Sequence, residues 1–228
     1  MQHLLLLHGA IGSMDQFADL KKILAEHYHV HCINFTGHGG LSLPKEDFSI
    51  KMFAADVLNY MEQTGVEAMN IFGYSMGGYV GMYLAKMVPE KINRLATLAT
   101  KFYWDEAIAE KETGMLNAQK IEEKLPAFAQ SLIERHQQQN WKQVLKKTAD
   151  MLIEMGKNNP LKSPDYTSIG IPVKLMLGDR DKMVTLDETL QVYRALPNAR
   201  VCIIPDTAHP IEAVGITRLT YEIRDFMK

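Results

Sequence analysis

Short apolar runs alternate with stretches of helical periodicity along most of this chain of 228 residues. Nearly continuous apolar runs are typical of strands in a parallel sheet that is covered on both faces. In the first hundred residues they predict strands at Leu4–Leu7, His29–Phe35, Met69–Phe72 and Ile92–Leu98. The segments between them predict helices that begin at Ser13, Ser49 and Met76, where Ser13 and Ser49 can serve as caps. The inner faces of these helices are expected to carry Phe17, Leu20 and Leu24, then Phe53, Val57 and Tyr60, then Val80, Tyr83, Leu84 and Met87.

This alternation stops at Thr100 and resumes with predicted strands at Ile171–Leu177 and 200–204 and helices at 186–195 and about 211–227. The intervening segment contains no strand-like run and predicts helices at 104–112, 118–124, 126–138 and 140–155. Strands that alternate with helices specify a parallel, doubly wound sheet. We therefore predict an α/β fold with a mainly parallel sheet of about six strands. Residues 1–100 and 166–228 form this core, and residues 101–165 form a helical cap inserted between two core strands.

The turn after the strand at Met69–Phe72 is suited to nucleophilic chemistry. It reads Gly73-Tyr74-Ser75-Met76-Gly77, a G-x-S-x-G sequence between a strand and a helix. Such a turn raises the serine hydroxyl above the sheet edge and leaves the next amide, that of Met76, free at a helix N-terminus, where negative charge is stabilised. The structural alternative is a glycine-rich packing turn whose serine only caps the helix.

Polar residues also follow three other predicted strands, at sheet ends that face the ligand crevice in open α/β folds. These segments read His8-Gly9-Ala10, Gly178-Asp179-Arg180-Asp181 and Thr207-Ala208-His209-Pro210. A serine needs a neighbouring base to take its proton, and a carboxylate must orient that base. The order Ser75, Asp181, His209 is the one expected for such a group, with Asp179 as the competing carboxylate.

Composition and spacing narrow the possible partners. A net charge of −2 without a basic stripe argues against nucleic acid. Cys32 and Cys202 lie in apolar runs, which favours buried thiols in a reducing compartment and hence a cytoplasmic location. The opening apolar run is too short for a signal peptide or a membrane anchor. No metal-ligand spacing and no dinucleotide-binding glycine motif is present, so we expect a small-molecule substrate and neither metal nor cofactor.

Five motifs occur in order at predicted strand ends: His8-Gly9-Ala10, Thr36-Gly37-His38-Gly39, Gly73-Tyr74-Ser75-Met76-Gly77-Gly78, Gly178-x-x-Asp181 and Ala208-His209-Pro210. As a set they resemble the α/β-hydrolase superfamily, from residue 2 to the C-terminus except for the cap. The resemblance implies that Ser75 is the nucleophile, His209 the base and Asp181 the orienting acid. It also implies an oxyanion hole made by the backbone amides of Ala10 and Met76. His38 is expected to shape a turn and His8 to hold the oxyanion loop by a local hydrogen bond.

Members of this superfamily commonly have two or more strands before the His-Gly strand, which here begins at residue 2. The resemblance therefore implies six strands rather than eight, with the strand at 29–35 at one edge. Branches with a Ser-x-Gly-Gly motif include carboxylesterases, thioesterases, carbon–carbon bond hydrolases and a menaquinone-biosynthesis synthase that eliminates pyruvate. In that synthase an arginine commonly follows the two glycines, where this chain has Tyr79.

These observations favour a carboxylesterase-like serine hydrolase that cleaves a small uncharged ester through an acyl-enzyme. Phe102, Tyr103 and Trp104 directly follow the fourth predicted strand, and we expect them to line an apolar acyl or alcohol pocket under the cap. The cap has balanced charge and offers no cationic cluster for an anionic substrate. Two alternatives stay open: a carbon–carbon hydrolase or lyase with the same triad, and a ligand-binding protein on the same fold.

Overall fold

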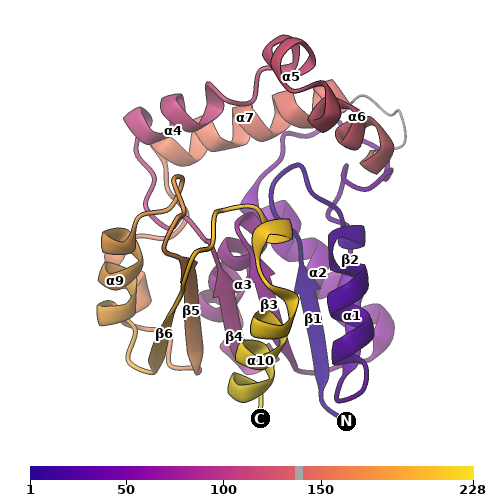
Figure 1. The fold of residues 1–228 in the computed structure, drawn as a ribbon. Coiled ribbons are helices and arrows are strands. Elements are labelled where there is room, and N and C mark those ends of the chain that lie inside the picture. The colour runs from indigo at the N-terminus through magenta and orange to yellow at the C-terminus, as the bar shows by residue number, and fades with distance from the viewer. Residues whose placement is uncertain (137–140) are drawn as a thin grey trace.

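A six-stranded, entirely parallel sheet forms the centre of the computed structural model, which describes residues 1–136 and 141–228. The strands are β1 (His3–Leu7), β2 (His29–Ile33), β3 (Met69–Tyr74), β4 (Ile92–Leu98), β5 (Val173–Gly178) and β6 (Ala199–Ile204). Their order across the sheet is β2-β1-β3-β4-β5-β6 (Figure 1). The predicted doubly wound sheet of six strands, with the second strand at an edge, is confirmed. The chain reverses its direction of travel between β1 and β3, and ligands of such folds bind beside this switch point.

Helices cover both faces of the sheet, and each face has its own apolar core (Figure 1). One face is covered by α2 (Ile50–Thr64), α3 (Met76–Met87) and α9 (Leu186–Ala195), and the other by α1 (Ala18–Leu24) and α10 (Ile216–Phe226). In β1, Leu5 and Leu7 join the first core, whereas Leu4 and Leu6 join the second. Because successive side chains of a strand point to opposite faces, one leucine run supplies both cores.

Capping residues set the helix starts as the sequence predicts. Ser49 accepts a hydrogen bond from the Met52 amide at the start of α2, and Gly65, with a φ of 67°, ends that helix. At the first helix, the Gln16 side chain accepts from the Ser13 amide at 3.2 Å. The turn after Ser13 is a 3-10 helix, η1 (Met14–Phe17), which continues into α1.

Several predicted boundaries and faces differ from the structure. The strand β5 begins only at Val173, because Pro172 before it has no N–H to donate to the sheet. The predicted final helix is divided into η3 (Ile211–Ala213) and α10, with Gly215 just before the second part. Met87, predicted on the inner face of α3, is exposed, and the buried face of that helix includes Tyr79 instead.

A layer of helices lies above the carboxyl ends of the strands and connects β4 to β5 (Figure 1). It comprises α4 (Glu106–Thr113), α5 (Ala118–Lys124), α6 (Pro126–Arg135) and α7 (Trp141–Lys157), and the short α8 (Ser163–Tyr166) leads back towards β5. These helices lie at nearly the predicted positions, although the predicted helix end at 138 and the predicted helix start at 140 fall outside the described residues. One apolar cluster belongs to this layer alone, and we call it the cap cluster: Ile121, Ala129, Leu132, Trp141 and Leu145. Within the described ranges, no helix combines the length and hydrophobicity needed to cross a membrane.

Candidate active site

Ser75 occupies the sharp turn between β3 and α3 with a φ of 50° and a ψ of −116°. Residues with side chains seldom adopt such a conformation, and those that do cluster at functional sites. Neighbouring glycines allow the turn: a Cβ on Gly73 would lie 2.4 Å from the Gly78 nitrogen, and one on Gly77 would lie 2.2 Å from the Leu7 carbonyl oxygen. The Ser75 hydroxyl makes no capping hydrogen bond to α3, so the serine is not simply a helix cap.

The loop after β1 approaches Ser75 closely. A Cβ on Gly9 would lie 3.3 Å from the Ser75 Cβ and would collide with the Tyr74 ring. Among the described residues, the backbone amides of Ala10 and Met76 donate to no protein acceptor. Both residues line the same cavity as Ser75, and Met76 is the first residue of α3, where the helix dipole favours negative charge. Two unpaired amides that share a cavity with a hydroxyl can serve as oxyanion donors.

His209 and Asp181 come from separate loops and form a hydrogen-bonded pair. His209 Nδ1 donates to Asp181 Oδ2 at 2.8 Å, and Asp181 Oδ1 accepts from the amides of Met183 and Val184 at 2.8 and 2.9 Å. Burial raises the pKa of Asp181, but the hydrogen bond from His209 and those from the two amides outweigh it, so the pKa is lower than usual. Asp181 is therefore ionised at neutral pH. It fixes the proton on Nδ1 and leaves the lone pair on His209 Nε2.

Asp179, the competing carboxylate, has a different task. Its Oδ1 accepts from the Thr207 amide at 3.1 Å, and its Oδ2 lies 3.7 Å from Arg180 Nε. The contact with Thr207 links the loop after β5 to the loop that carries His209, and neither contact involves the imidazole. The structure thus places Asp181, and not Asp179, against His209.

Ser75 and His209 face one cavity of about 360 Å³. The Tyr74 hydroxyl donates to the His209 carbonyl at 3.2 Å, and the two rings are 5.8 Å apart, which holds the histidine loop beside the serine turn. The described structure contains no direct hydrogen bond between the Ser75 hydroxyl and His209. Contacts between nucleophile and base often tighten only when substrate binds.

A family model for the alpha/beta hydrolase fold matches residues 2–152 of this sequence. The chain belongs to the α/β-hydrolase fold family. The family is named for its hydrolases.

Named relatives of this α/β-hydrolase chain differ in activity. Lipase 3 of Moraxella sp. (strain TA144) is 24% identical over 248 residues, which cover 99% of this chain and 78% of that protein. The dihydrolipoyllysine-residue acetyltransferase component of the acetoin cleaving system of Cupriavidus necator is 30% identical over 122 residues, 54% of this chain. That match and two others each span only 33% of the relative's own length. The structure of the enol-lactonase from Burkholderia xenovorans LB400 shares the fold, with a TM-score of 0.79, 20% identity, and coverage of 99% of this chain and 90% of that one.

The cavity over Ser75, which we call the Ser75 cavity, is walled by both parts of this α/β-hydrolase chain. Its lower wall comes mainly from the loops after β1, β3, β5 and β6, and its upper wall comes from the helical layer. The upper wall is mostly apolar and includes Leu116, Ile121, Phe128, Met151 and Met155. An uncharged organic group fits such a lining.

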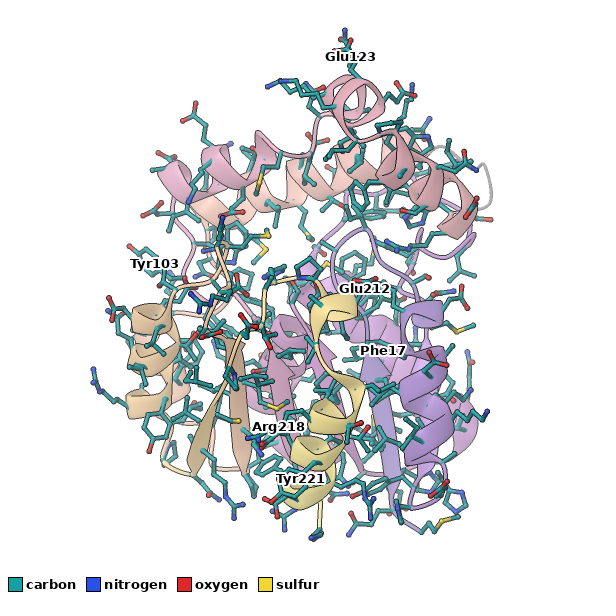
Figure 2. All side chains as sticks on the ribbon, in the orientation of Figure 1. Phe17, Tyr103, Glu123, Glu212, Arg218 and Tyr221 are labelled. Carbon is teal, nitrogen blue, oxygen red and sulfur yellow. The ribbon has the colours of Figure 1, made fainter. Side chains whose placement is uncertain are left out.

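Four charged side chains also line the described part of this cavity, and the sequence reasoning missed them as site residues. They are Lys101, Glu112, Arg135 and Glu212. Lys101 Nζ lies 3.3 Å from a carboxylate oxygen of Glu188 and 4.0 Å from one of Glu112. Arg135 Nη2 lies 4.0 Å from a carboxylate oxygen of Glu212. Glu212 lies below the helical layer (Figure 2). Each cation therefore has a carboxylate nearby. The four residues belong to four separate segments, so only the fold reveals that they share a cavity.

The predicted pocket residues Phe102, Tyr103 and Trp104 divide between two cavities. Trp104 lines the Ser75 cavity, but Phe102 and Tyr103 line only a second cavity of about 240 Å³. Phe102 is buried against the rings of Tyr79 and Tyr166, and Tyr103 is 53% exposed at the outer surface (Figure 2). The expectation for Phe102 and Tyr103 is thus wrong. After β4, Lys101 and Trp104 line the Ser75 cavity, whereas the two aromatic residues between them line the second cavity.

Two buried histidines lie beside the loops that follow β1 and β2. His8 Nδ1 donates to the Gly9 carbonyl at 2.8 Å, and its Nε2 accepts from the Phe35 amide at 3.1 Å. Burial lowers the pKa of His8 from 6.5 to about 4 and also lowers that of His38, which contacts the Thr36 carbonyl at 3.1 Å. The contacts of His8 with Gly9 and of His38 with Thr36 are local ones, as predicted. Across the described ranges, no three His, Cys, Asp or Glu side chains converge as a metal site requires.

Proposed function

We propose that this chain is a serine hydrolase that cleaves a small uncharged ester through an acyl-enzyme. The observation that carries the proposal is a strained serine that shares one cavity with a histidine whose Nδ1 is held by a buried aspartate. A serine is a weak nucleophile until a neighbouring base takes its proton, and this arrangement provides one. The relatives named lipase and enol-lactonase are consistent with an ester substrate.

In the proposed reaction, Ser75 Oγ forms a bond to the ester carbonyl carbon while its proton moves to His209 Nε2. The carbonyl oxygen becomes an oxyanion, which accepts hydrogen bonds from the amides of Ala10 and Met76. The tetrahedral intermediate then breaks its bond to the alcohol, which leaves with the proton from His209. Water attacks the acyl-enzyme with His209 again as base, and the acid leaves as Ser75 regains its proton. Asp181 stays ionised and stabilises the imidazolium.

The lining of the Ser75 cavity supports an uncharged substrate of modest size. Most of the upper wall of the cavity is apolar. The two cations that line the described part of the cavity, Lys101 and Arg135, each lie within 4.0 Å of a carboxylate. An anionic substrate would have to compete for those cations. We propose residues 101–165 as a cap whose inner surface selects the acyl or alcohol group. Each methylene that this wall buries would strengthen binding by up to about 0.8 kcal/mol until the cavity is full.

The test is hydrolysis of a panel of p-nitrophenyl esters from acetate to decanoate, together with thioesters and lactones. We expect the wild-type protein to turn over at least one ester class, with kcat/KM rising over the first chain lengths. Ser75→Ala should keep the melting temperature of the wild type and lose almost all turnover. Turnover that survives in Ser75→Ala would rule out the proposed nucleophile.

A further inference from the structure

Ile11 is a strained residue in the loop that carries the proposed oxyanion donor Ala10. The Gly12 amide donates to the Gly9 carbonyl at 3.1 Å, which closes a turn around Ala10 and Ile11. Ile11 has a φ of 52°. A β-branched side chain strongly disfavours this left-handed conformation, which turns usually assign to glycine or asparagine. Some other part of the molecule must therefore hold Ile11 in place.

Two consecutive residues at the end of α6 donate hydrogen bonds to the Ile11 carbonyl. Arg135 Nη1 and His136 Nε2 each lie 3.1 Å from this oxygen. The Gly39 amide donates to His136 Nδ1 at 3.2 Å. Since Nδ1 accepts this bond, the ring proton of neutral His136 is on Nε2, where it can reach Ile11. His136 is 1% exposed, so it is shielded from bulk solvent.

The Ile11 side chain is held by the same part of the molecule. It is partly buried and packs against the cap cluster as well as against the core cluster that includes Met76. The end of α6 and the cap cluster thus restrain both the carbonyl and the side chain of Ile11. A strained turn held at both points has little freedom to change the direction of its amides.

We infer that His136 and Arg135 are positioning residues that hold Ile11 in its strained conformation and thereby keep the Ala10 amide directed at the developing oxyanion. The inference rests on the proposed function of Ser75 and Ala10. His136 is the cleaner probe of the two, because Arg135 also lines the Ser75 cavity whereas His136 does not. A positioning role acts on the transition state and leaves substrate binding almost unchanged.

The experiment compares His136→Leu with His136→Gln, whose amide can both accept from Gly39 and donate to Ile11. The substrate is p-nitrophenyl butyrate, and the second probe is an alkyl trifluoromethyl ketone, which adds to Ser75 to form an oxyanion. We expect His136→Leu to lower kcat about tenfold to a hundredfold, less than the loss of a whole oxyanion donor, with KM within about twofold. The affinity for the trifluoromethyl ketone should fall in parallel, and His136→Gln should recover most of both. The matched control is His27→Leu, at an exposed histidine more than a hundred residues before His136 in the sequence. It should behave as wild type.

A wild-type kcat and a wild-type trifluoromethyl ketone affinity in His136→Leu would overturn the inference while leaving the proposed function intact. A loss seen in KM alone would overturn it as well. If His136→Leu is unfolded at the assay temperature, Arg135→Gln takes its place, with a smaller expected loss of kcat because one donor to Ile11 remains. Ser75→Ala is measured alongside. Activity that survives in Ser75→Ala would overturn the proposed function and, with it, the positioning role. If Ser75→Ala is inactive, a wild-type result for His136→Leu overturns the positioning role alone.

Discussion

The lower and upper walls of the Ser75 cavity are held by different kinds of interaction. The lower wall depends on close backbone contacts: a Cβ on Gly77 would lie 2.2 Å from the Leu7 carbonyl, and Asp181 is fixed by three hydrogen bonds. The upper wall depends on apolar side chains, and one of them, Phe128, is 37% exposed. Fixed backbone geometry suits groups that must be held precisely against a transition state. Apolar side chains, in contrast, can be replaced by others of similar size with only a small loss of stability. We therefore expect substitutions in the lower wall to abolish the proposed reaction, and substitutions in the upper wall to change which substrates are accepted.

The largest expected effect separates Asp181 from Asp179, the two aspartates in the loop after β5. Asp181→Asn should lower kcat by about 10³-fold to 10⁴-fold, because the amide cannot hold the Nδ1 proton of His209 as the carboxylate does. Asp179→Asn should cost less than about tenfold, since an amide oxygen can still accept from the Thr207 amide. Steady-state kinetics on p-nitrophenyl esters measure both. Equal, mild losses would mean that Asp181 is not the orienting acid.

The next largest effect is expected on the free energy of unfolding, at Gly77 in the turn after Ser75. Gly77→Ala should destabilise the fold by about 3 kcal/mol or more, because the added methyl group meets backbone that cannot move aside. Gly170→Ala is the control, since a Cβ there has no heavy atom within 4 Å. Urea unfolding followed by circular dichroism gives both free energies of unfolding. Similar values for the two variants would contradict the close contact between α3 and the end of β1.

Acid should weaken the fold through His8, the buried histidine that follows β1. Burial depresses the pKa of His8 to about 4 in the folded chain, so the unfolded chain binds the extra proton between pH 6.5 and 4. Above pH 6.5 His8 is neutral in both states and changes nothing, and about 3 kcal/mol of stability is lost as the pH falls from 6.5 to 4. The lowered pKa of Asp181 adds a further loss at lower pH. An unfolding free energy that stays constant between pH 7 and 5 would be incompatible with a neutral, buried His8.

The smallest effect is expected in the upper wall. Phe128→Ala should lower kcat/KM for the longest esters about threefold to tenfold with little change for acetate, because it removes apolar surface from the Ser75 cavity. Phe102→Ala should destabilise the fold but leave the chain-length profile unchanged, since its ring packs outside that cavity. A chain-length series on both variants makes the comparison. A profile that responds to Phe102 and not to Phe128 would mean that substrate binds in the second cavity.

The same contrast explains what the sequence could predict. Ser75, Asp181 and His209 stand beside strand ends in a fixed order, so local patterns and a family resemblance were enough to select them. The parallel, doubly wound sheet followed from the alternation of strands and helices, and the place of the strand at 29–35 at an edge followed from the resemblance. Phe102 and Tyr103 were misplaced because the path of the chain after β4 depends on tertiary packing. Arg135 and His136 carry no local signal, since their contact with Ile11 joins segments more than a hundred residues apart.

The central claim is that His209 and Asp181 activate Ser75, and covalent labelling tests it most directly. A fluorophosphonate probe reacts with an activated serine and leaves an inert one unmodified. Intact mass spectrometry and peptide mapping should show one adduct per chain, located on Ser75, and no adduct on Ser75→Ala. A folded wild-type protein that stays unlabelled, or that carries its label on another serine, would contradict the account.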